Sequence, residues 1–245
     1  MRQALVTGAT SGIGRAIALA LHRAGHRVTA VGRDPAALAD LATQGIAPLA
    51  LDLGQVADLP DRLAAALAGD VPDVLVNNAG MVAPPGHFCD MAEGDIHRLV
   101  ATNLTQALLV TRAVAPGMRA RGRGHIFFTG SVAGHAPYPN MAVYAATKAA
   151  LGGFAQSLRL ELSPSGVRVT EIVAGRVESP LYKDVLPPDA RAALYAGQTA
   201  VQPGDVATMV LAVLALPAHV DVSRFDILPT RQPVTPQVPA SETRT

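Results

Sequence analysis

The first two dozen residues restrict the fold more than any other stretch, because a strand, a glycine-rich turn and a helix follow one another without interruption. Residues 4–6 form a short apolar run typical of a buried parallel strand, and a helical pattern continues from the turn to residue 24. Similar strands, separated by helical stretches, are expected at residues 27–31, 47–51, 73–76, 124–129, 167–173 and 223–228. This alternation predicts an α/β fold, a three-layer, doubly wound parallel β-sheet of about seven strands with helices on both faces.

The length of the chain favours one domain. At 245 residues it can bury one large core, and we expect a single domain over residues 1–228. Residues 178–200 contain Pro180, Pro187 and Pro188 without a clean periodicity at their start, which indicates a loop-and-helix lid over the strand ends. Residues 229–245 are predicted to be a proline-rich C-terminal tail.

Charge and cysteine content exclude several classes of function. The formal net charge is +1, and the Lys and Arg residues are scattered, so neither a basic stripe for nucleic acid nor a polybasic membrane patch is present. The single cysteine, Cys89, excludes an intramolecular disulfide and a zinc cluster. The apolar run at 206–216 is well below the roughly 20 residues that cross a bilayer. We therefore expect a soluble, cytoplasmic protein that binds no metal, no nucleic acid and no membrane.

The turn after the first strand holds three glycines with separable roles. Gly8 can adopt a backbone conformation closed to other residues, Gly12 allows a ligand to approach, and Gly14 lets the helix pack on the strand. The amino terminus of the helix then offers free amides to a pyrophosphate. A glycine-rich turn without a ligand is the alternative, but the position at the first strand-to-helix turn favours a dinucleotide.

The end of the second strand bears on the choice between NAD and NADP. An acid at this point binds the ribose hydroxyls of NAD, whereas an arginine favours the 2′-phosphate of NADP. Gly32 occupies the strand end and Arg33 follows, so NADP is preferred, unless Arg33 is only a solvated charge. Asp34 lies where an NAD-selecting acid could be, but we interpret it as a helix N-cap because Pro35 suits the first helical position.

Polar residues follow the next strands. Asp52, Asn77 and Asn78 fall at carboxyl ends, where doubly wound sheets bind their ligands, although the amides can equally satisfy backbone groups there. Residues 91–121 indicate a long helical stretch that contains Asn103. A polar amide inside an apolar helix needs a partner, such as an ordered water or a disrupted helix carbonyl.

The stretch from residue 131 to residue 148 suits proton transfer. Tyr144 and Lys148 are four residues apart in a run, 142–162, that is predicted to be one helix, so they share a face. An ammonium beside a phenol is expected to lower the pKa of Tyr144 from about 10 towards neutrality. Ser131 follows the apolar strand 124–129 and can donate a hydrogen bond to a carbonyl oxygen. Taken alone, a chance Tyr-Lys pair and a turn serine explain these residues equally well.

In this order and spacing the motifs resemble the short-chain dehydrogenase/reductase family, of the single-domain, Rossmann-like type, over residues 4–228. The family's cofactor loop is matched by Thr7, Gly8, Gly12, Ile13 and Gly14, its adenine-side aspartate by Asp52, its Asn-Asn-Ala-Gly motif by residues 77–80, and its catalytic tetrad by Asn103, Ser131, Tyr144 and Lys148. The resemblance implies a dinucleotide-binding and catalytic domain.

The resemblance also implies roles for these residues. Tyr144 would be the general acid in reduction and the base in oxidation, and Ser131 would polarise the carbonyl. Lys148 would lower the tyrosine pKa and bind the nicotinamide ribose, and Asn103 would hold a water in a proton relay. The implied cofactor site comprises Gly8, Thr10, Ser11, Gly12, Ile13, Gly14, Arg33, Asp52, Leu53, Asn78, Ala79, Gly80, Tyr144, Lys148, Gly175, Val177 and Ser179.

The implied activity is hydride transfer between nicotinamide and a secondary alcohol or ketone, with NADP(H) preferred and NAD(H) as the alternative. Residues 216–220 and 227–230 resemble the branch of NADP-dependent 3-hydroxy acid and serine dehydrogenases. A carboxylate substrate would need a cation near the lid, and Arg176 and Lys183 are the candidates, unless they are surface charges. Two departures stand out, because Ala174-Gly175 replaces the family's Pro-Gly and Ser179 replaces its threonine.

Two other functions remain as alternatives, a non-enzymatic NADP sensor or scaffold and a halohydrin dehalogenase-like lyase. Lys148 and the intact glycine loop oppose the second, since those enzymes carry arginine at the lysine position. The family resemblance further implies a homo-oligomer, a tetramer or a dimer. Small residues in the helix at 142–162 would permit close helix contacts between subunits or packing on the chain's own sheet; they are Ala145, Ala146, Ala149, Ala150, Gly152 and Gly153.

Overall fold

The computed structural model describes residues 2–231, and in them a single parallel sheet runs through the whole structure. Its strands lie in the order β3-β2-β1-β4-β5-β6-β7, and all neighbouring pairs are parallel. Their bounds are β1 Gln3–Thr7, β2 Arg27–Gly32, β3 Ala47–Ala50, β4 Val74–Asn77, β5 Gly124–Thr129, β6 Val167–Ala174 and β7 Arg224–Ile227. The predicted seven-stranded doubly wound fold is confirmed, with the reversal of strand order between β1 and β4.

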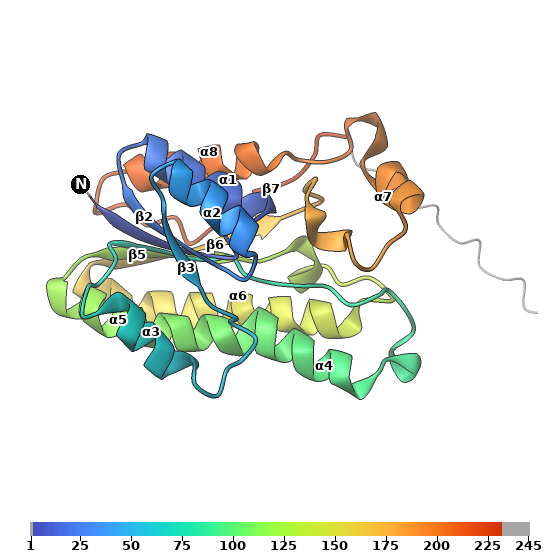
Figure 1. Ribbon diagram of the computed structural model, residues 1–245, viewed down its shortest axis with the longest axis horizontal. Coiled ribbons are helices and arrows are strands. Elements are labelled where there is room, and N and C mark those ends of the chain that lie inside the picture. Colours follow the sequence, from blue (N-terminus) through green and yellow to red (C-terminus); the bar gives the residue numbers. More distant parts are fainter. Residues whose placement is uncertain (1, 232–245) are drawn as a thin grey trace, which may run out of the picture.

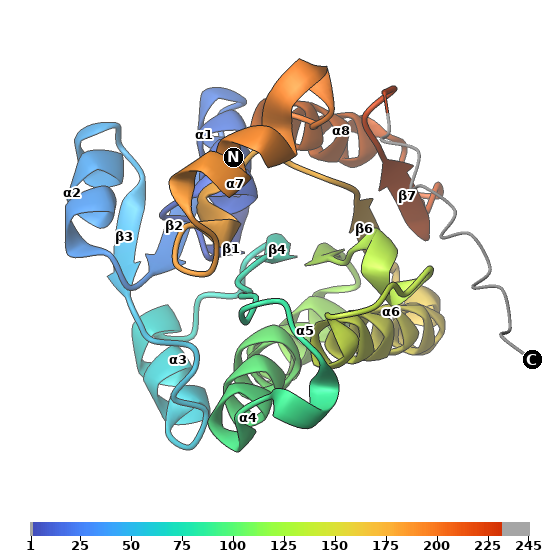
Figure 2. The ribbon, with the colours of Figure 1, turned by 90° about the vertical axis from the view of Figure 1, so that its right-hand side faces the viewer.

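Helices cover both faces of the sheet (Figure 1), with α1, α2 and α8 on one side and α3, α4, α5 and α6 on the other. Their bounds are α1 Gly12–Arg23, α2 Pro35–Thr43, α3 Leu59–Leu67, α4 Glu93–Val100, α5 Gln106–Arg121, α6 Ala142–Leu162, α7 Pro188–Tyr195 and α8 Pro203–Ala215. Figure 2 looks onto one end of this sandwich and shows the two helical layers apart. The predicted helix at 142–162 is confirmed with the same bounds as α6.

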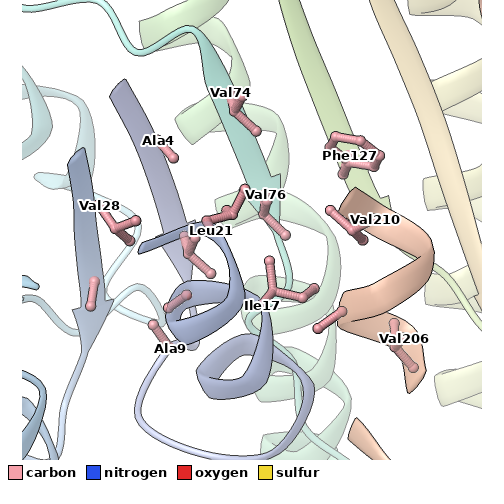
Figure 3. Packing of buried hydrophobic residues seen from close by; sticks show 14 of the residues in the cluster. Ala4, Ala9, Ile17, Leu21, Val28, Val74, Val76, Phe127, Val206 and Val210 are labelled. Atoms are coloured by element: carbon pink, nitrogen blue, oxygen red, sulfur yellow. The ribbon is translucent and has the colours of Figure 1, made fainter. Parts of the chain in front are cut away.

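Each helical layer seals its own hydrophobic core. Under α1 and α8, Ile17, Leu21 and Val210 pack towards the sheet residues Val76 and Phe127, and all five are fully buried (Figure 3). On the opposite face, a second cluster gathers side chains of β1, β4 and β5 against α5 and α6. Because each buried large aliphatic side chain stabilises the fold by about 1.5–3 kcal/mol, these clusters fix the carboxyl ends of the strands rigidly in place.

The predicted lid lies beyond one end of the sheet, where Figure 1 places α7. It consists of a 3₁₀ turn, Pro180–Tyr182, the helix α7 and a second 3₁₀ turn, Ala196–Gln198. A parallel bridge between Val177 and Val201 closes its base, with Val201 N donating to Arg176 O over 2.8 Å. The segment therefore leaves and rejoins the fold at one point.

Two further sequence predictions concern membrane insertion and the C-terminal tail. Within the described part of the chain, no helix is both long and apolar enough to cross a membrane. The predicted C-terminal tail, 229–245, falls outside the described residues from position 232 onwards.

Candidate active site

The glycine turn after β1 has the geometry that its sequence predicts. Gly8 and Gly12 have φ angles of +63° and +51°, in the left-handed region that favours glycine. A Cβ on Gly14 would lie 2.3 Å from the carbonyl oxygen of Gly8, so no larger residue fits there. Ser11 precedes α1 without accepting a capping hydrogen bond, which leaves amides of the first helical turn available to a phosphate.

Thr7 and Asn78 fasten this turn to the neighbouring strand β4. The Thr7 hydroxyl accepts hydrogen bonds from the amides of Asn78 and Ala79 at 2.9 and 3.1 Å. The Asn78 side chain donates to the carbonyls of Thr7 and Gly8 at 3.2 and 3.3 Å and accepts from the Thr129 hydroxyl at 3.2 Å. Asn77 points instead into the sheet's helical cover and donates to Thr111 over 3.0 Å. The backbone-satisfying role considered for these amides is thus present at Asn78.

The end of β2 presents a cation and no acid of its own. The Asp34 carboxylate accepts from the amides of Ala36 and Ala37 at 3.0 and 3.1 Å, so its interpretation as the N-cap of α2 is confirmed. Arg33 is 76% exposed, and its guanidinium lies 3.9 Å from an Asp52 carboxylate oxygen. Asp52 also accepts from the amide of Gly54 over 3.0 Å.

Gly32 leaves room for a neighbour at the same strand end. A Cβ on this glycine would lie 2.3 Å from the Thr10 methyl group. Thr10 therefore packs into the space where an acidic side chain on the strand end would begin. This arrangement favours the cation, Arg33, as the group that meets an adenosine ribose.

Three groups of the proposed tetrad meet at the carboxyl end of β5. Tyr144 and Lys148 lie on the buried face of α6, and the Lys148 ammonium donates to the carbonyl of Thr129 over 2.7 Å and lies 5.8 Å from the centre of the Tyr144 ring. Ser131 begins a short turn, residues 131–135, which we call the Ser131 turn, and its hydroxyl accepts from the amide of Ala133 at 3.2 Å. A Cβ on Gly134 would lie 2.8 Å from the Lys148 backbone, so the turn rests directly on α6.

Burial dominates the electrostatics of Tyr144 and Lys148. It raises the pKa of Tyr144 to about 12, against the opposing effect of a hydrogen bond with Ser131. It lowers the pKa of Lys148 to about 8, against the opposing charge of Glu171. The expectation that Lys148 would bring the pKa of Tyr144 towards neutrality is therefore wrong for this structure, because desolvation of the phenol outweighs the other contributions.

Asn103 lies in a π-helical segment, Ala101–Thr105, that interrupts the run from α4 to α5. Its side-chain oxygen accepts from the amide of Met81 at 2.7 Å, and its nitrogen donates to the Met81 carbonyl at 3.0 Å and to Thr147 at 3.3 Å. The amide thus bonds backbone outside its own helix, and not the disrupted helix carbonyl considered from the sequence. A Cβ on Gly80 would lie 3.3 Å from the Asn103 oxygen and 3.7 Å from the Lys148 ammonium, so Gly80 borders both groups.

All four tyrosines of the chain influence one another around this site, and sequence reasoning missed three of them. Burial raises the pKa of Tyr182, and the nearby phenols of Tyr144, Tyr138 and Tyr195 raise it further, while the charge of Arg176 lowers it. Burial also raises the pKa values of Tyr138 and Tyr195, and Arg176 opposes both shifts. The chain has only four tyrosines, and all of them follow the ends of two predicted strands, 124–129 and 167–173. This clustering was the signal available in the sequence.

The two candidate cations of the lid occupy different places. Arg176 donates to the carbonyl of Leu194 over 3.2 Å and acts on the tyrosines. Lys183 lines an open cavity of about 700 Å³ on the lid, together with Glu178 and Arg191. Arg176 thus influences Tyr138, Tyr182 and Tyr195, whereas Lys183 shares its cavity with Tyr195.

The departures from the family pattern do not disrupt the end of β6. Ala174 is the last residue of the strand and pairs with Ile227, and the amide of Gly175 donates to the Ile227 carbonyl over 2.9 Å. Ser179 packs against the glycine turn, since a Cβ on Gly12 would lie 3.1 Å from its own Cβ. Its hydroxyl accepts from the amide of Leu181 at 3.4 Å. The predicted lid therefore starts in contact with the glycine turn.

The family model of the short chain dehydrogenases matches residues 2–189, which include the glycine turn, residues 77–80 and the four tetrad residues. The chain belongs to the short-chain dehydrogenase family. It is an oxidoreductase of the class that acts on CH–OH groups. The seven-stranded parallel sheet and its helical layers are the fold of this family.

Relatives of this short-chain dehydrogenase match over nearly their whole length. It is 46% identical to an uncharacterized short-chain type dehydrogenase/reductase of Sinorhizobium fredii over 94% of the chain and 92% of the relative. It is 38% identical to an NADP-dependent 3-hydroxy acid dehydrogenase of Salmonella typhi over 93% and 95%. A solved structure of the closed form of serine dehydrogenase complexed with NADP+ is 34% identical, with a TM-score of 0.85 over 93% and 94% of the two chains. The branch indicated by the sequence is thus supported.

The residues present in this dehydrogenase fit a dinucleotide phosphate. The positive φ angles of Gly8 and Gly12 and the crowding at Gly14 form a cradle that a Cβ would fill. Amides of the first turn of α1 supply donors for a pyrophosphate, and Arg33 supplies a cation at the end of β2. The relatives and the chemistry of the site both support NADP binding.

Proposed function

We propose that the protein is an NADP(H)-dependent oxidoreductase that interconverts a secondary alcohol and a ketone, with a 3-hydroxy acid or another small hydroxy compound as substrate. The observation that carries the proposal is the meeting of Ser131, Tyr144 and Lys148 at the end of β5, beside the glycine turn of β1. NADP is favoured over NAD by Arg33 and by the use of Asp34 as a helix cap.

The chain's own residues divide the chemical work. The bound cofactor would supply or accept the hydride, and the protein would supply orientation and proton transfer. Tyr144 would donate a proton to the substrate oxygen in reduction and accept it in oxidation, while the Ser131 hydroxyl polarises the same oxygen. The Lys148 ammonium would bind the nicotinamide ribose. Asn103 would hold the water of a proton relay.

The remaining cofactor contacts follow from the strand ends. Gly8, Thr10, Ser11, Gly12, Ile13 and Gly14 would surround the pyrophosphate at the turn of β1. Asp52 and Leu53 would flank the adenine after β3, residues 78–80 the ribose after β4, and Gly175, Val177 and Ser179 the carboxamide after β6.

Arg176 is the group that would bind an acidic substrate. It lies close enough to Tyr138, Tyr182 and Tyr195 to influence their pKa values, and the relatives of the chain include dehydrogenases named for 3-hydroxy acids and serine. A carboxylate near Arg176 would gain a charge-assisted hydrogen bond. Arg176→Ala is expected to raise KM about tenfold for hydroxy acids and less than twofold for neutral alcohols. Equal effects on both substrate classes would contradict this role.

The small residues of α6 separate into two sets. Ala145, which packs with Leu99 and Ala133, and Gly152, which packs against β6, are buried within the chain, whereas Ala146, Ala149, Ala150 and Gly153 are exposed. We propose that the exposed set contacts a second copy of the chain in a homotetramer or homodimer. Light scattering of the purified protein tests this, and a monomer at micromolar concentration would contradict it.

A spectrophotometric panel at about 340 nm tests the activity directly. NADP and NAD are each offered with serine, 3-hydroxy acids and simple secondary alcohols, and the reduced cofactors with ketones. We expect turnover with NADP, and faster turnover with hydroxy acids than with neutral alcohols. A clear preference for NAD would contradict the assignment of Arg33, and NADPH binding without any turnover would favour a sensor.

A further inference from the structure

A carboxylate lies buried behind the proposed catalytic groups. Glu171 is in the middle of β6, on the face covered by α6, and it is 1% exposed. An ionised side chain without water costs several kcal/mol unless partners compensate for the lost hydration. The neighbouring strand offers no partner for an acid here, because the residue paired with Glu171 on β5 is the apolar Phe128. The carboxylate therefore calls for an explanation in terms of its surroundings.

Two glycines make the space for this carboxylate. A Cβ on Gly130 would lie 2.5 Å from an oxygen of Glu171, and a Cβ on Gly152 would lie 2.9 Å from the same oxygen. Gly130 separates Thr129, whose carbonyl accepts from Lys148, from Ser131. Gly152 is one helical turn beyond Lys148 in α6. The carboxylate thus touches both segments that carry the site.

His135 binds the same oxygen from the opposite side. Its Nε2 lies 2.9 Å from Oε1 of Glu171, and its side chain is 34% exposed. His135 ends the Ser131 turn, and its amide donates to the carbonyl of Val132 over 3.0 Å. This contact therefore connects the Ser131 turn to the central sheet. The second oxygen of Glu171 has no hydrogen-bond partner among the described residues.

We infer that Glu171 and His135 are positioning residues of the active site, which together hold the Ser131 turn on the sheet and place a negative charge behind Lys148. The inference rests on the proposed function, because it assigns these residues to the same site. Neither residue touches the reacting atoms in this role. Glu171 acts through Lys148, and His135 acts through the Ser131 turn.

The electrostatics of Lys148 agree with this geometry. Burial lowers the pKa of Lys148 to about 8, and the charge of Glu171 is the influence that opposes the shift. Three basic residues lie on the elements around Glu171, namely His135 in the Ser131 turn, Lys148 in α6 and Arg224, its register partner on β7. Arg224 also pairs with Asp226 over 3.0 Å. Lys148 is the fully buried member of the three, and so the most dependent on the carboxylate.

The test is the pH dependence of kcat in Glu171→Gln, with Asp226→Asn as a matched control that removes a half-exposed carboxylate from the next strand. Without the charge of Glu171 the pKa of Lys148 falls, so the ammonium is lost at lower pH. We expect the basic limb of the kcat profile to move down by about one pH unit in E171Q. We expect no movement in D226N. An unmoved limb in E171Q would overturn the role assigned to Glu171.

His135→Asn tests the other half of the pair and also covers a failure of E171Q to fold. The variant removes the bond to Glu171 from a partly exposed turn and keeps the carboxylate charge. We expect kcat to fall about tenfold at every pH with a basic limb close to that of the wild type. A purely structural role would lower the melting temperature and the active fraction and leave kcat per active site unchanged, and that result would overturn the inference.

A readout without turnover separates this inference from the proposed function. NADPH binding, followed by its fluorescence between pH 6 and about pH 9, should weaken as Lys148 loses its proton, and at lower pH in E171Q than in wild type. Wild-type protein that binds NADPH but converts no substrate would contradict the proposed function alone. Identical binding profiles for the two proteins would contradict the role of Glu171 alone.

Discussion

The glycine turn after β1 and the Ser131 turn after β5 both lie at the carboxyl ends of the strands, but different kinds of interaction hold them in place. Around the glycine turn, neutral hydrogen bonds from Thr7 and Asn78 to backbone groups set the conformation. Around the Ser131 turn, buried titratable groups do so, since Lys148 bonds Thr129 and His135 bonds Glu171. The first region should therefore respond to changes in shape, and the second to changes in charge and pH.

The difference follows from what each region would have to do. A cofactor loop must present amides to a phosphate at a fixed distance, which glycines and a helix end provide without any titrating group. Proton transfer requires titratable groups close to the substrate, and burial changes the pKa values of the two such groups here, Tyr144 and Lys148. Burial also makes the second region more expensive in stability.

Removal of the Tyr144 hydroxyl is expected to have the largest effect on the Ser131 side of the comparison. Tyr144→Phe removes the proposed proton donor and its hydrogen bond with Ser131 but keeps the buried ring. We expect kcat to fall about 1,000-fold, within the range that a positioned acid or base contributes. Steady-state kinetics measure this, and NADPH affinity should stay within about twofold of wild type, because the glycine turn and Lys148 are unchanged. Retained turnover would show that the proton comes from elsewhere.

Much of this comparison can be predicted from the sequence. The strand, turn and helix pattern predicts the sheet, and the spacing of Tyr144 and Lys148 predicts their shared helix face, because both depend on local periodicity. The Pro35 signal likewise predicts Asp34 as a helix cap. Each of these features involves residues close together in the chain.

The features that the sequence does not predict are contacts between distant residues. Glu171 and His135 are 36 positions apart, and Asn103 binds Met81 across 22 positions. The tyrosines of the lid reach Tyr144 only because β6 returns beside β5. The pKa of Tyr144 was misjudged for the same reason, since the degree of burial depends on the packing of the whole fold.

The charge of Lys148 should make stability depend on pH. Burial lowers its pKa from an ordinary 10.5 to about 8. Between these values the unfolded chain holds a proton that the native protein has lost, so stability rises with pH by about 1.4 kcal/mol per unit. Above pH 10 the raised pKa of Tyr144 has the opposite effect, because the unfolded tyrosine then loses its proton first. The informative window is therefore pH 8 to 10.

Lys148→Met isolates this contribution. Urea unfolding of wild type and variant at pH 8, 9 and about 10 gives two slopes, and their difference removes all other titrating groups. We expect the wild-type free energy of unfolding to rise more steeply than that of the variant across the window. Absolute stabilities are not compared, since methionine also leaves the Thr129 carbonyl without its donor. Parallel slopes would mean that Lys148 keeps an ordinary pKa and is not desolvated.

A change of shape alone should damage the glycine turn. In Gly14→Ala the new methyl group would lie 2.3 Å from the Gly8 carbonyl oxygen and 2.4 Å from the Asn78 amide nitrogen. The turn must shift, and we expect a loss of about 1–3 kcal/mol in stability together with weaker NADPH binding. Chemical denaturation and cofactor fluorescence measure the two effects.

Gly94→Ala is the matched control for this change, because Gly94 also lies in the first turn of a helix, α4, but has no atom within 4 Å of an added Cβ. Alanine there should raise stability by about 0.5–1 kcal/mol through the lower entropy of the unfolded chain. The same chemical substitution thus changes sign with position. If G14A bound NADPH as tightly as wild type, the turn would tolerate displacement, and shape would not be what governs the cofactor side of the sheet.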